Sequence, residues 1–187
     1  MASGRRHAEG PLIARWKERI GEHGFKVGIA WHGNPKTLDV SKFIALQEFA
    51  PLAAIPGVRL ISLQYRDGLD QLARLPADVS IEALGDDFNR GPDGFVDTAA
   101  VMSSLDLVIT CDTSIAHLAG ALARPTWIGL KQVPDWRWML EREDSPWYPT
   151  VRLFRQPQAG AWAPVFARMA PELRSMVRAG AGKQQSG

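Results

Sequence analysis

Short apolar runs alternate along the chain with longer segments in which apolar residues recur at helical spacing. The run 106–111 (DLVITC) is almost wholly apolar, which is typical of a strand buried inside a parallel sheet. The segment 11–24 instead spaces its apolar residues three to four positions apart and ends at a glycine, as an amphipathic helix does. Strands are predicted at 26–34, 58–64, 78–84, 106–111, 125–130 and 150–156. Helices are predicted at 11–24, 44–57, 68–76, 96–105, 114–123 and 162–177.

Six strands that alternate with helices predict an α/β fold of the Rossmann-like kind. We expect a mostly parallel six-stranded sheet with helices on both faces and right-handed crossovers. The expected strand order is 3-2-1-4-5-6, within one domain at 11–177. The polar start, 1–10, is predicted to be disordered, and 178–187 is predicted to be a flexible tail.

This strand order places the first and fourth strands side by side at the point where the order reverses. Ligands of such sheets bind at the carboxyl ends of the strands near this point. The two strands end in WHGN (31–34) and CDTS (111–114). We therefore expect the two loops to face one crevice.

The segment TCDTSIAHLAG opens a helix directly after the fourth strand. A helix N-terminus offers unpaired N–H groups and a positive dipole end, and Thr113 and Ser114 add two hydroxyls. His117 lies four residues after Thr113, so both share one helix face. Together these groups could receive a phosphate. In such a phosphate site Asp112 would shape the turn. The alternative is an ordinary helix cap by Asp112 or Thr113, with a core histidine.

The segment WHGNPKTLDVSK is the second candidate for phosphate binding. Gly33 and Asn34 predict a turn, and Lys36 and Lys42 could bring positive charge over a diphosphate. His32 could bind a ligand or simply end the strand. A solvated loop with two surface lysines is the alternative interpretation.

Composition and missing motifs exclude several classes of function. The balance of 22 basic and 20 acidic residues is too even to indicate nucleic-acid or membrane binding. A single cysteine rules out an internal disulfide and favours a reducing, cytoplasmic compartment. The chain has no GxGxxG, P-loop or GxSxG motif, and its four histidines lack metal-ligand spacing, so no metal and no cofactor are expected.

Three blocks in this order resemble the C-terminal, donor-binding half of GT-B glycosyltransferases. They are KVGIAWHGNPK, FVDTAAVMSSLDLVITCDTSIAHLAGALARPTW and DWRWMLEREDSPWYPTVRLFRQ. The likeness is to heptosyltransferase-like family 9 domains that follow tetratricopeptide repeats in bacterial proteins, and it covers roughly residues 25 to 177.

The resemblance implies a Rossmann-like domain that binds a nucleotide-diphosphate sugar as substrate. It implies phosphate or donor contacts for seven residues: Gly33, Asn34, Lys42, Asp112, Thr113, Ser114 and His117. Four more residues are predicted as possible parts of the donor pocket: His32, Lys36, Gln64 and Trp136. SKFIAL stands where relatives usually have RSIPL, so the loop near the phosphates is expected to differ.

A complete GT-B enzyme has a second domain that carries the acceptor site and the usual catalytic base. Only about 24 residues precede the first predicted strand, so we expect this chain to bind a donor with little or no transfer activity alone. The catalytic residues stay unknown, with His32 the only candidate base. The alternative function is an interaction or dimerisation module derived from half of a GT-B fold, whose partner would be a second copy or the missing half.

Overall fold

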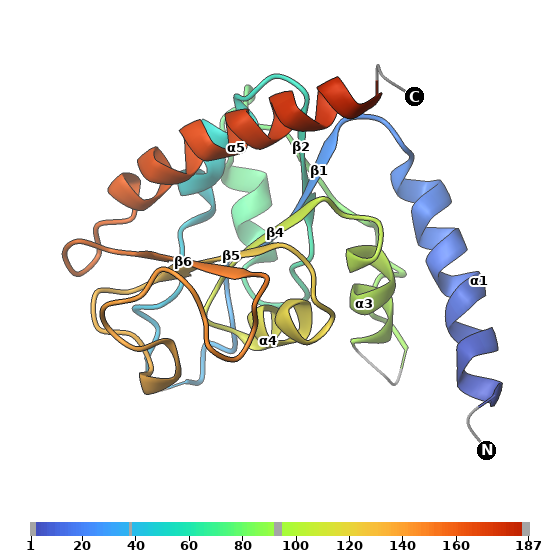
Figure 1. The fold of residues 1–187 in the computed structure, drawn as a ribbon, viewed down its shortest axis with the longest axis horizontal. Helices are drawn as coiled ribbons and strands as arrows, with labels where there is room; N and C mark the ends of the chain where they lie inside the picture. The colour runs from blue at the N-terminus through green and yellow to red at the C-terminus, as the bar shows by residue number, and fades with distance from the viewer. Residues whose placement is uncertain (1–2, 38, 92–94, 185–187) are drawn as a thin grey trace.

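Six parallel strands form one sheet in the computed structural model, which describes residues 3–37, 39–91 and 95–184 (Figure 1). The order is β3-β2-β1-β4-β5-β6, and every strand pair in this order is parallel. The predicted fold class and strand order are therefore confirmed. The strands are β1 (Phe25–Ala30), β2 (Val58–Ser62), β3 (Ile81–Glu82), β4 (Leu107–Cys111), β5 (Thr126–Leu130) and β6 (Val151–Arg155).

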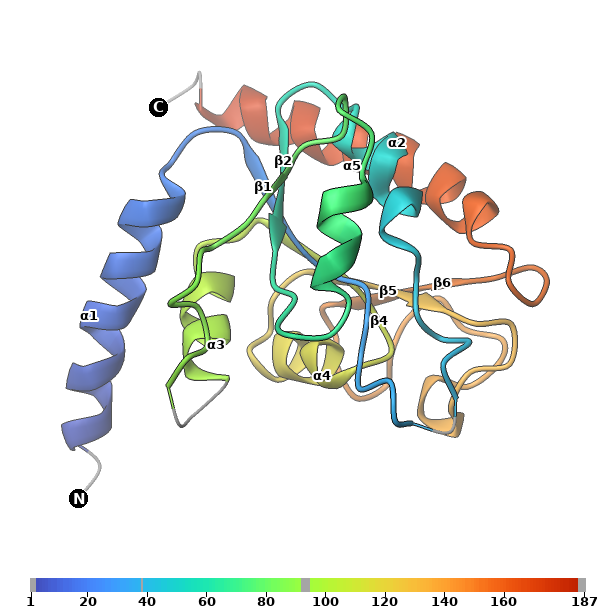
Figure 2. The ribbon, with the colours of Figure 1, turned by 180° about the vertical axis from the view of Figure 1, so that it is seen from behind.

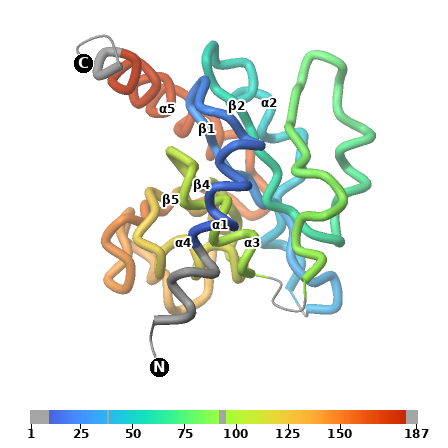
Figure 3. Tube along the Cα trace, turned by 90° about the vertical axis from the view of Figure 1, so that its right-hand side faces the viewer, coloured from blue at the N-terminus to red at the C-terminus, as the bar shows by residue number. Residues whose placement is uncertain are grey.

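Helices cover both faces of the sheet (Figures 1 and 2). The helix α5 crosses one face together with α2, while α1, α3 and α4 lie on the other. The tube in Figure 3 shows α1 outermost over α3. The helices are α1 (Ser3–Ile20), α2 (Ala50–Ala53), α3 (Val96–Met102), α4 (Ser114–Ala121) and α5 (Ala163–Gln184), with the 3₁₀ helices η1 (Leu46–Phe49), η2 (Leu69–Arg74) and η3 (Trp136–Trp138).

Side chains of each central strand alternate between the two faces, so the sheet separates two cores. In β4, Leu107 and Ile109 pack on the side of α2 and α5, whereas Val108 packs on the side of α1 and α3. Phe166 of α5 meets Phe49 of η1 at 4.7 Å between ring centroids on the first side. A third, smaller core lies between α4 and the last two strands.

Trp16 holds α1 against the sheet. Its side chain is fully buried, and its indole N–H donates to Asp97 Oδ1 at 2.8 Å. Asp97 is a plausible N-cap by sequence, but the structure places Phe95 at the N-cap of α3. Asp97 instead lies in the first turn, where Oδ2 also accepts from the Asn89 N–H.

Several elements are shorter than their sequence patterns predict. β1 ends at Ala30 because the N–H groups of Trp31 and His32 turn to Gln64 Oε1, at 3.1 Å each. The predicted helix 44–57 is a 3₁₀ turn followed by one turn of α-helix, and the predicted helix 68–76 is the 3₁₀ helix η2. The strand predicted at 78–84 pairs over two residues only, as an edge strand can.

The terminal helices extend beyond the predicted domain limits. α1 begins at Ser3, inside the segment 1–10, and α5 continues to Gln184, inside the segment 178–187. No helix among the described residues is long and apolar enough to cross a bilayer.

Candidate functional site

The start of α4 lies at the switch point of the sheet. β4 pairs with β1, with Thr110 opposite Ala30, so the loops after both strands leave the sheet side by side. Thr113 is the N-cap residue in extended conformation, at φ −136° and ψ 177°, and its side chain makes no cap hydrogen bond. The Thr113 hydroxyl lies 3.4 Å from that of Thr110, and its carbonyl accepts from Ala116 N–H. The first N–H groups of α4 are therefore open to an outside acceptor.

Gly33 brings the loop after β1 into contact with this helix start. A Cβ at this position would lie 3.2 Å from Thr113 Cγ2 and 2.9 Å from Phe43 Cε1. The Phe43 ring in turn packs on His32, with 4.3 Å between ring centroids. The prediction that the two loops share one crevice is confirmed.

Both loops line a pocket of about 170 Å³, which we call the crevice pocket. Its remaining walls come from the segments after β2 and β3 and from the start of α3. Tyr65 and Phe95, neither of them a sequence candidate, contribute aromatic side chains, and Phe95 is half exposed. From the predicted set the lining contains His32, Gly33, Asn34, Gln64, Thr113 and Ser114.

Gln64 lines the crevice pocket, but its amide serves the protein backbone. Oε1 accepts from two N–H groups of the β1 loop, while Nε2 donates to His32 O at 2.9 Å and to Asp67 O at 2.8 Å. Its four hydrogen-bonding positions are thus occupied. Gln64 shapes the pocket and has no free polar atom for a ligand.

His117 does not line the crevice pocket and instead packs towards the β5–β6 connection. Its ring stacks on the buried Trp138, with 5.3 Å between centroids, and Nδ1 lies 3.2 Å from the Tyr148 hydroxyl. Burial is the main cause that lowers the pKa of His117. The charge of Arg137 lowers this pKa further, and the charge of Asp112 opposes the shift. The imidazole is therefore favoured in its neutral form, which keeps Nε2 as a hydrogen-bonding group.

Four charged residues act on His117 through space, and we call them the charged cluster. Lys42, Asp112, Asp135 and Arg137 all act on the pKa of His117. The loop with Lys42 is held in place because Asp39 pairs with Lys131 after β5, which lowers the pKa of Asp39 to about 2. This ion pair also holds the loop after β1 beside the β5–β6 connection, as Figure 2 shows.

Asp112 is 8% exposed and follows β4 directly, so it lies just before the start of α4. Its oxygens are not among the described buried side-chain atoms that lack a hydrogen-bond partner.

Three residues predicted for the site have side chains that are either used within a turn or exposed outside the pockets. Asn34 lines the crevice pocket, but its Oδ1 accepts from Lys36 N–H at 2.9 Å within a turn. Lys36 is exposed and lines neither described pocket. Trp136 is 76% exposed at the start of η3, also outside both pockets.

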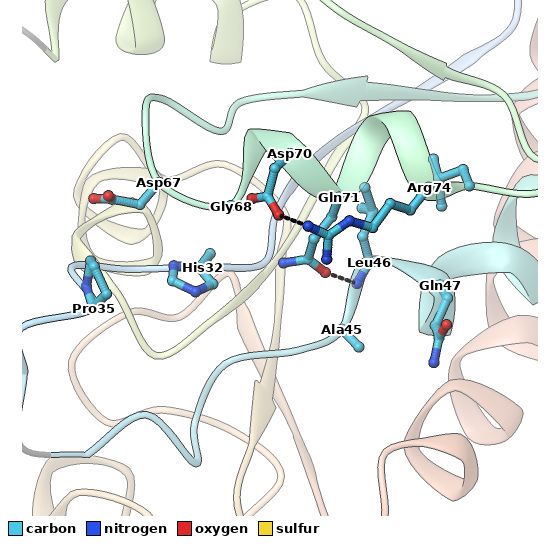
Figure 4. A pocket seen from close by; sticks show the side chains of 11 residues that line it. His32, Pro35, Ala45, Leu46, Gln47, Asp67, Gly68, Asp70, Gln71 and Arg74 are labelled. Carbon is cyan, nitrogen blue, oxygen red and sulfur yellow. Dashed lines mark hydrogen bonds and ion pairs between the residues drawn. The ribbon is translucent and has the colours of Figure 1, made fainter.

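A second pocket, of about 500 Å³, lies between the loop after β1 and η2 (Figure 4), and we call it the lateral pocket. Its lining is polar on the side of the Asp70–Arg74 ion pair, and Gln71 Oε1 accepts from Leu46 N–H. His32 and Asp67 line both this pocket and the crevice pocket. His32 Nδ1 lies 2.7 Å from the Gly33 carbonyl, so Nδ1 carries the proton and Nε2 is the free nitrogen of the neutral ring.

No three His, Cys, Asp or Glu side chains gather as metal ligands in the part of the chain that the structure describes.

Cys111 lies directly beneath the site at the end of β4 and is fully buried, which raises the pKa of its thiol to about 12. We expect native protein to resist thiol reagents at pH 8, because the thiolate that reacts is scarce and sealed from solvent. Labelling in urea should become complete within minutes. Fast labelling of folded protein would contradict the buried position, and a small thiol peptide serves as the reactivity control.

Comparison with solved structures identifies the fold. An all-parallel six-stranded Rossmann-like sheet with its open helix start at the switch point is the fold of one half of a GT-B glycosyltransferase. No family model matches the chain. The fold is similar to that of E. coli ADP-heptose lps heptosyltransferase II, with a TM-score of 0.66 and 14% identity over 91% of this chain and 52% of that one.

Further similarities lead to the same fold. E. coli heptosyltransferase WaaC with ADP-2-deoxy-2-fluoro heptose matches with a TM-score of 0.56 and 17% identity, over 86% of this chain and 47% of that one. A family 9 glycosyl transferase from Veillonella parvula matches with a TM-score of 0.57 and 12% identity, over 78% of this chain and 40% of that one. The chain thus spans about half the length of these structures.

One curated protein shares clear sequence similarity with the chain. Protein FlbA of Caulobacter vibrioides is 32% identical over 172 residues, which are 88% of this chain and 28% of FlbA. The chain therefore spans little more than a quarter of the curated relative that it matches.

Proposed function

We propose that this chain is a donor-binding domain of a glycosyltransferase, which holds a nucleotide-diphosphate sugar with its diphosphate at the start of α4. The observation that carries the proposal is the uncapped first turn of α4, which opens into the crevice pocket at the switch point of the sheet. An anion is stabilised there by free N–H groups and by the helix dipole. A structure of similar fold holds ADP-2-deoxy-2-fluoro heptose, which is a ligand of this chemical class.

The two sides of the helix start suit the two ends of such a ligand. The crevice pocket offers aromatic side chains, Tyr65 and Phe95, on which a base can stack. Lys42 and His117 do not line this pocket, and we place the terminal phosphate and the sugar on their side of the helix start. The donor therefore binds with its nucleoside in the crevice pocket and its diphosphate over Thr113 and Ser114.

Glycosyl transfer needs a stabilised leaving diphosphate and a base for the acceptor hydroxyl. The helix start, Lys42 and His117 supply the first requirement. His32, with Nε2 free on the wall between the two pockets, is the only candidate base that the sequence indicates in this chain. We infer that efficient transfer needs a second domain that brings the acceptor site, as in two-domain enzymes.

The alternative function is a non-enzymatic interaction module, in which the same fold binds a protein partner and catalyses no reaction. It is favoured by four exposed apolar side chains of the β5–β6 connection: Val133, Trp136, Leu140 and Trp147. A homodimer or a separate partner domain would cover them. The tetratricopeptide-repeat context and a cytoplasmic location also stay predictions.

Calorimetric titration with ADP, UDP, GDP and their sugar conjugates tests the proposed function. We expect one of the three nucleotides to bind, and His117→Ala and Lys42→Ala each to weaken diphosphate binding about tenfold, because a charge-assisted contact is lost. Binding of the bare nucleoside should change much less.

Lys36→Ala is the matched control, because Lys36 is a lysine of the same loop that is exposed, whereas Lys42 is half-buried and acts on His117. If no nucleotide binds at millimolar concentration, the proposed function is wrong and the interaction module is the remaining alternative. Equal weakening of nucleoside and diphosphate would argue against contact with phosphate.

A further inference from the structure

We propose that Arg137 is an additional ligand-binding residue of this site, which contacts the terminal phosphate of the bound nucleoside diphosphate. This inference rests on the proposed function. It assigns a role to the β5–β6 connection, which lies outside the two predicted phosphate loops.

Arg137 is held in place from both its backbone and its side chain. Asp135 caps η3, and its Oδ1 accepts from Arg137 N–H at 3.1 Å and from Arg137 Nε at 2.8 Å. The indole N–H of Trp147 donates to the Arg137 carbonyl at 3.1 Å. A guanidinium held in this way loses little further freedom when it binds a ligand.

The neighbouring residue, Trp138, anchors the short helix that carries Arg137 to α4. Trp138 is fully buried and stacks on His117, with ring planes 19° apart. His117 lies one helical turn from Thr113. Consistent with this placement, the charge of Arg137 lowers the pKa of His117, and the charge of Asp112 favours the protonated form of Arg137.

The side chain of Arg137 has donors left for a ligand. Asp135 takes only Nε, and the two terminal nitrogens have no hydrogen-bond partner among the described residues. About 43% of the side chain is exposed. Arg142, which follows Arg137 in the same β5–β6 connection, differs because its Nε and Nη2 donate to both oxygens of Asp144.

The chemistry of a guanidinium fits a terminal phosphate better than a sugar or a base. Two parallel N–H groups match two phosphate oxygens. The charged cluster holds two cations, Lys42 and Arg137, and two anions, Asp112 and Asp135, around a neutral imidazole. An anion would therefore be recognised by the placement of donors and not by an excess of positive charge.

Only the distal part of the ligand would reach this residue. Arg137 does not line the crevice pocket, where Thr113 and Ser114 meet the nucleoside side of the site. A nucleoside monophosphate in this pocket would end at the helix start. The second phosphate of a diphosphate would extend towards His117 and Arg137.

Titration of paired nucleotides tests the inference: ADP with AMP, UDP with UMP, and GDP with GMP. With the pair that wild-type protein binds, Arg137→Gln should weaken diphosphate binding at least tenfold and monophosphate binding less than twofold. Arg137→Lys should fall between, because lysine keeps the charge without the fork. Arg142→Gln is the control and should change neither affinity.

The outcomes separate this inference from the proposed function. If wild-type protein binds no nucleotide, the proposed function fails. If it binds a diphosphate and Arg137→Gln weakens both members of the pair equally, or neither, the role of Arg137 is overturned.

A second measurement needs no ligand. Titration of the His117 ring by NMR should show a higher pKa in Arg137→Gln than in wild type, because a nearby positive charge is removed. Arg142→Gln should leave the pKa unchanged. An unchanged pKa in Arg137→Gln would place the guanidinium away from α4 and overturn the inference.

Discussion

Trp138→Ala should destabilise the protein by about 3–5 kcal/mol, the usual cost of truncating a large buried aromatic side chain. Trp138 is fully buried in the small core between α4 and the last two strands, where its ring stacks on His117. Its loss would leave a cavity and release η3 from α4. Urea denaturation followed by circular dichroism measures the change in the free energy of unfolding.

Trp136→Ala is the matched control, since it removes the same side chain two residues away in η3. Trp136 is 76% exposed, so the change in stability should stay within about 0.5 kcal/mol. Trp138→Phe should cost less than Trp138→Ala, because the indole N–H has no partner among the described residues and a ring is kept. Similar losses of unfolding free energy in Trp136→Ala and Trp138→Ala would contradict the role of Trp138 in holding η3 against α4.

Gly33→Val should lower the affinity for a nucleoside diphosphate on the order of 100-fold, which corresponds to roughly 2.7 kcal/mol. A Cβ at Gly33 already meets the Phe43 ring at 2.9 Å and Thr113 Cγ2 at 3.2 Å, and the two valine methyl groups need still more room. The loop and the start of α4 would separate, so their donors would no longer converge on one anion. Gly33 is not among the residues with positive φ, so the expected effect is steric.

Calorimetric titration and a thermal melt of the same sample distinguish a damaged site from a damaged fold. Gly91→Val is the control, because a Cβ at Gly91 would have no atom within 4 Å among the described residues beyond its chain neighbours. We expect Gly91→Val to bind like wild type. Unchanged affinity in Gly33→Val would mean that the contact between the two loops does not shape the site.

Sequence reasoning located residues of the site, but it did not show which of their side-chain atoms are free to bind a ligand. Thr113 and Ser114 could be found because a strand followed at once by a helix start has a recognisable pattern, and the strand order places Gly33 opposite them. Gln64 was a candidate for the donor pocket, yet its amide is used by the backbone of two loops. Only coordinates reveal which hydrogen-bonding atoms of such a side chain are already occupied.

Arg137, in contrast, was not singled out from the sequence, and only the structure indicates a role for it. The sequence shows an arginine between two tryptophans and a charge-rich loop for which internal ion pairs are expected. Its position near His117 depends on Trp138 packing beneath the helix, which is a contact between residues 21 positions apart. No local periodicity encodes that contact.

The sequence by itself determined the alternation of strands and helices, the parallel sheet and the strand order, because apolar periodicity and the handedness of crossovers act through short segments and few rules. Helix lengths at 44–57 and 68–76 were less well determined, since tertiary contacts override weak local propensity. Only the tertiary structure decided that Gly33 lies against Thr113, that Gln64 uses its amide for the backbone, and that Trp138, next to Arg137, stacks on His117. Loops from distant parts of the chain meet at the site, and their meeting depends on packing across the whole sheet.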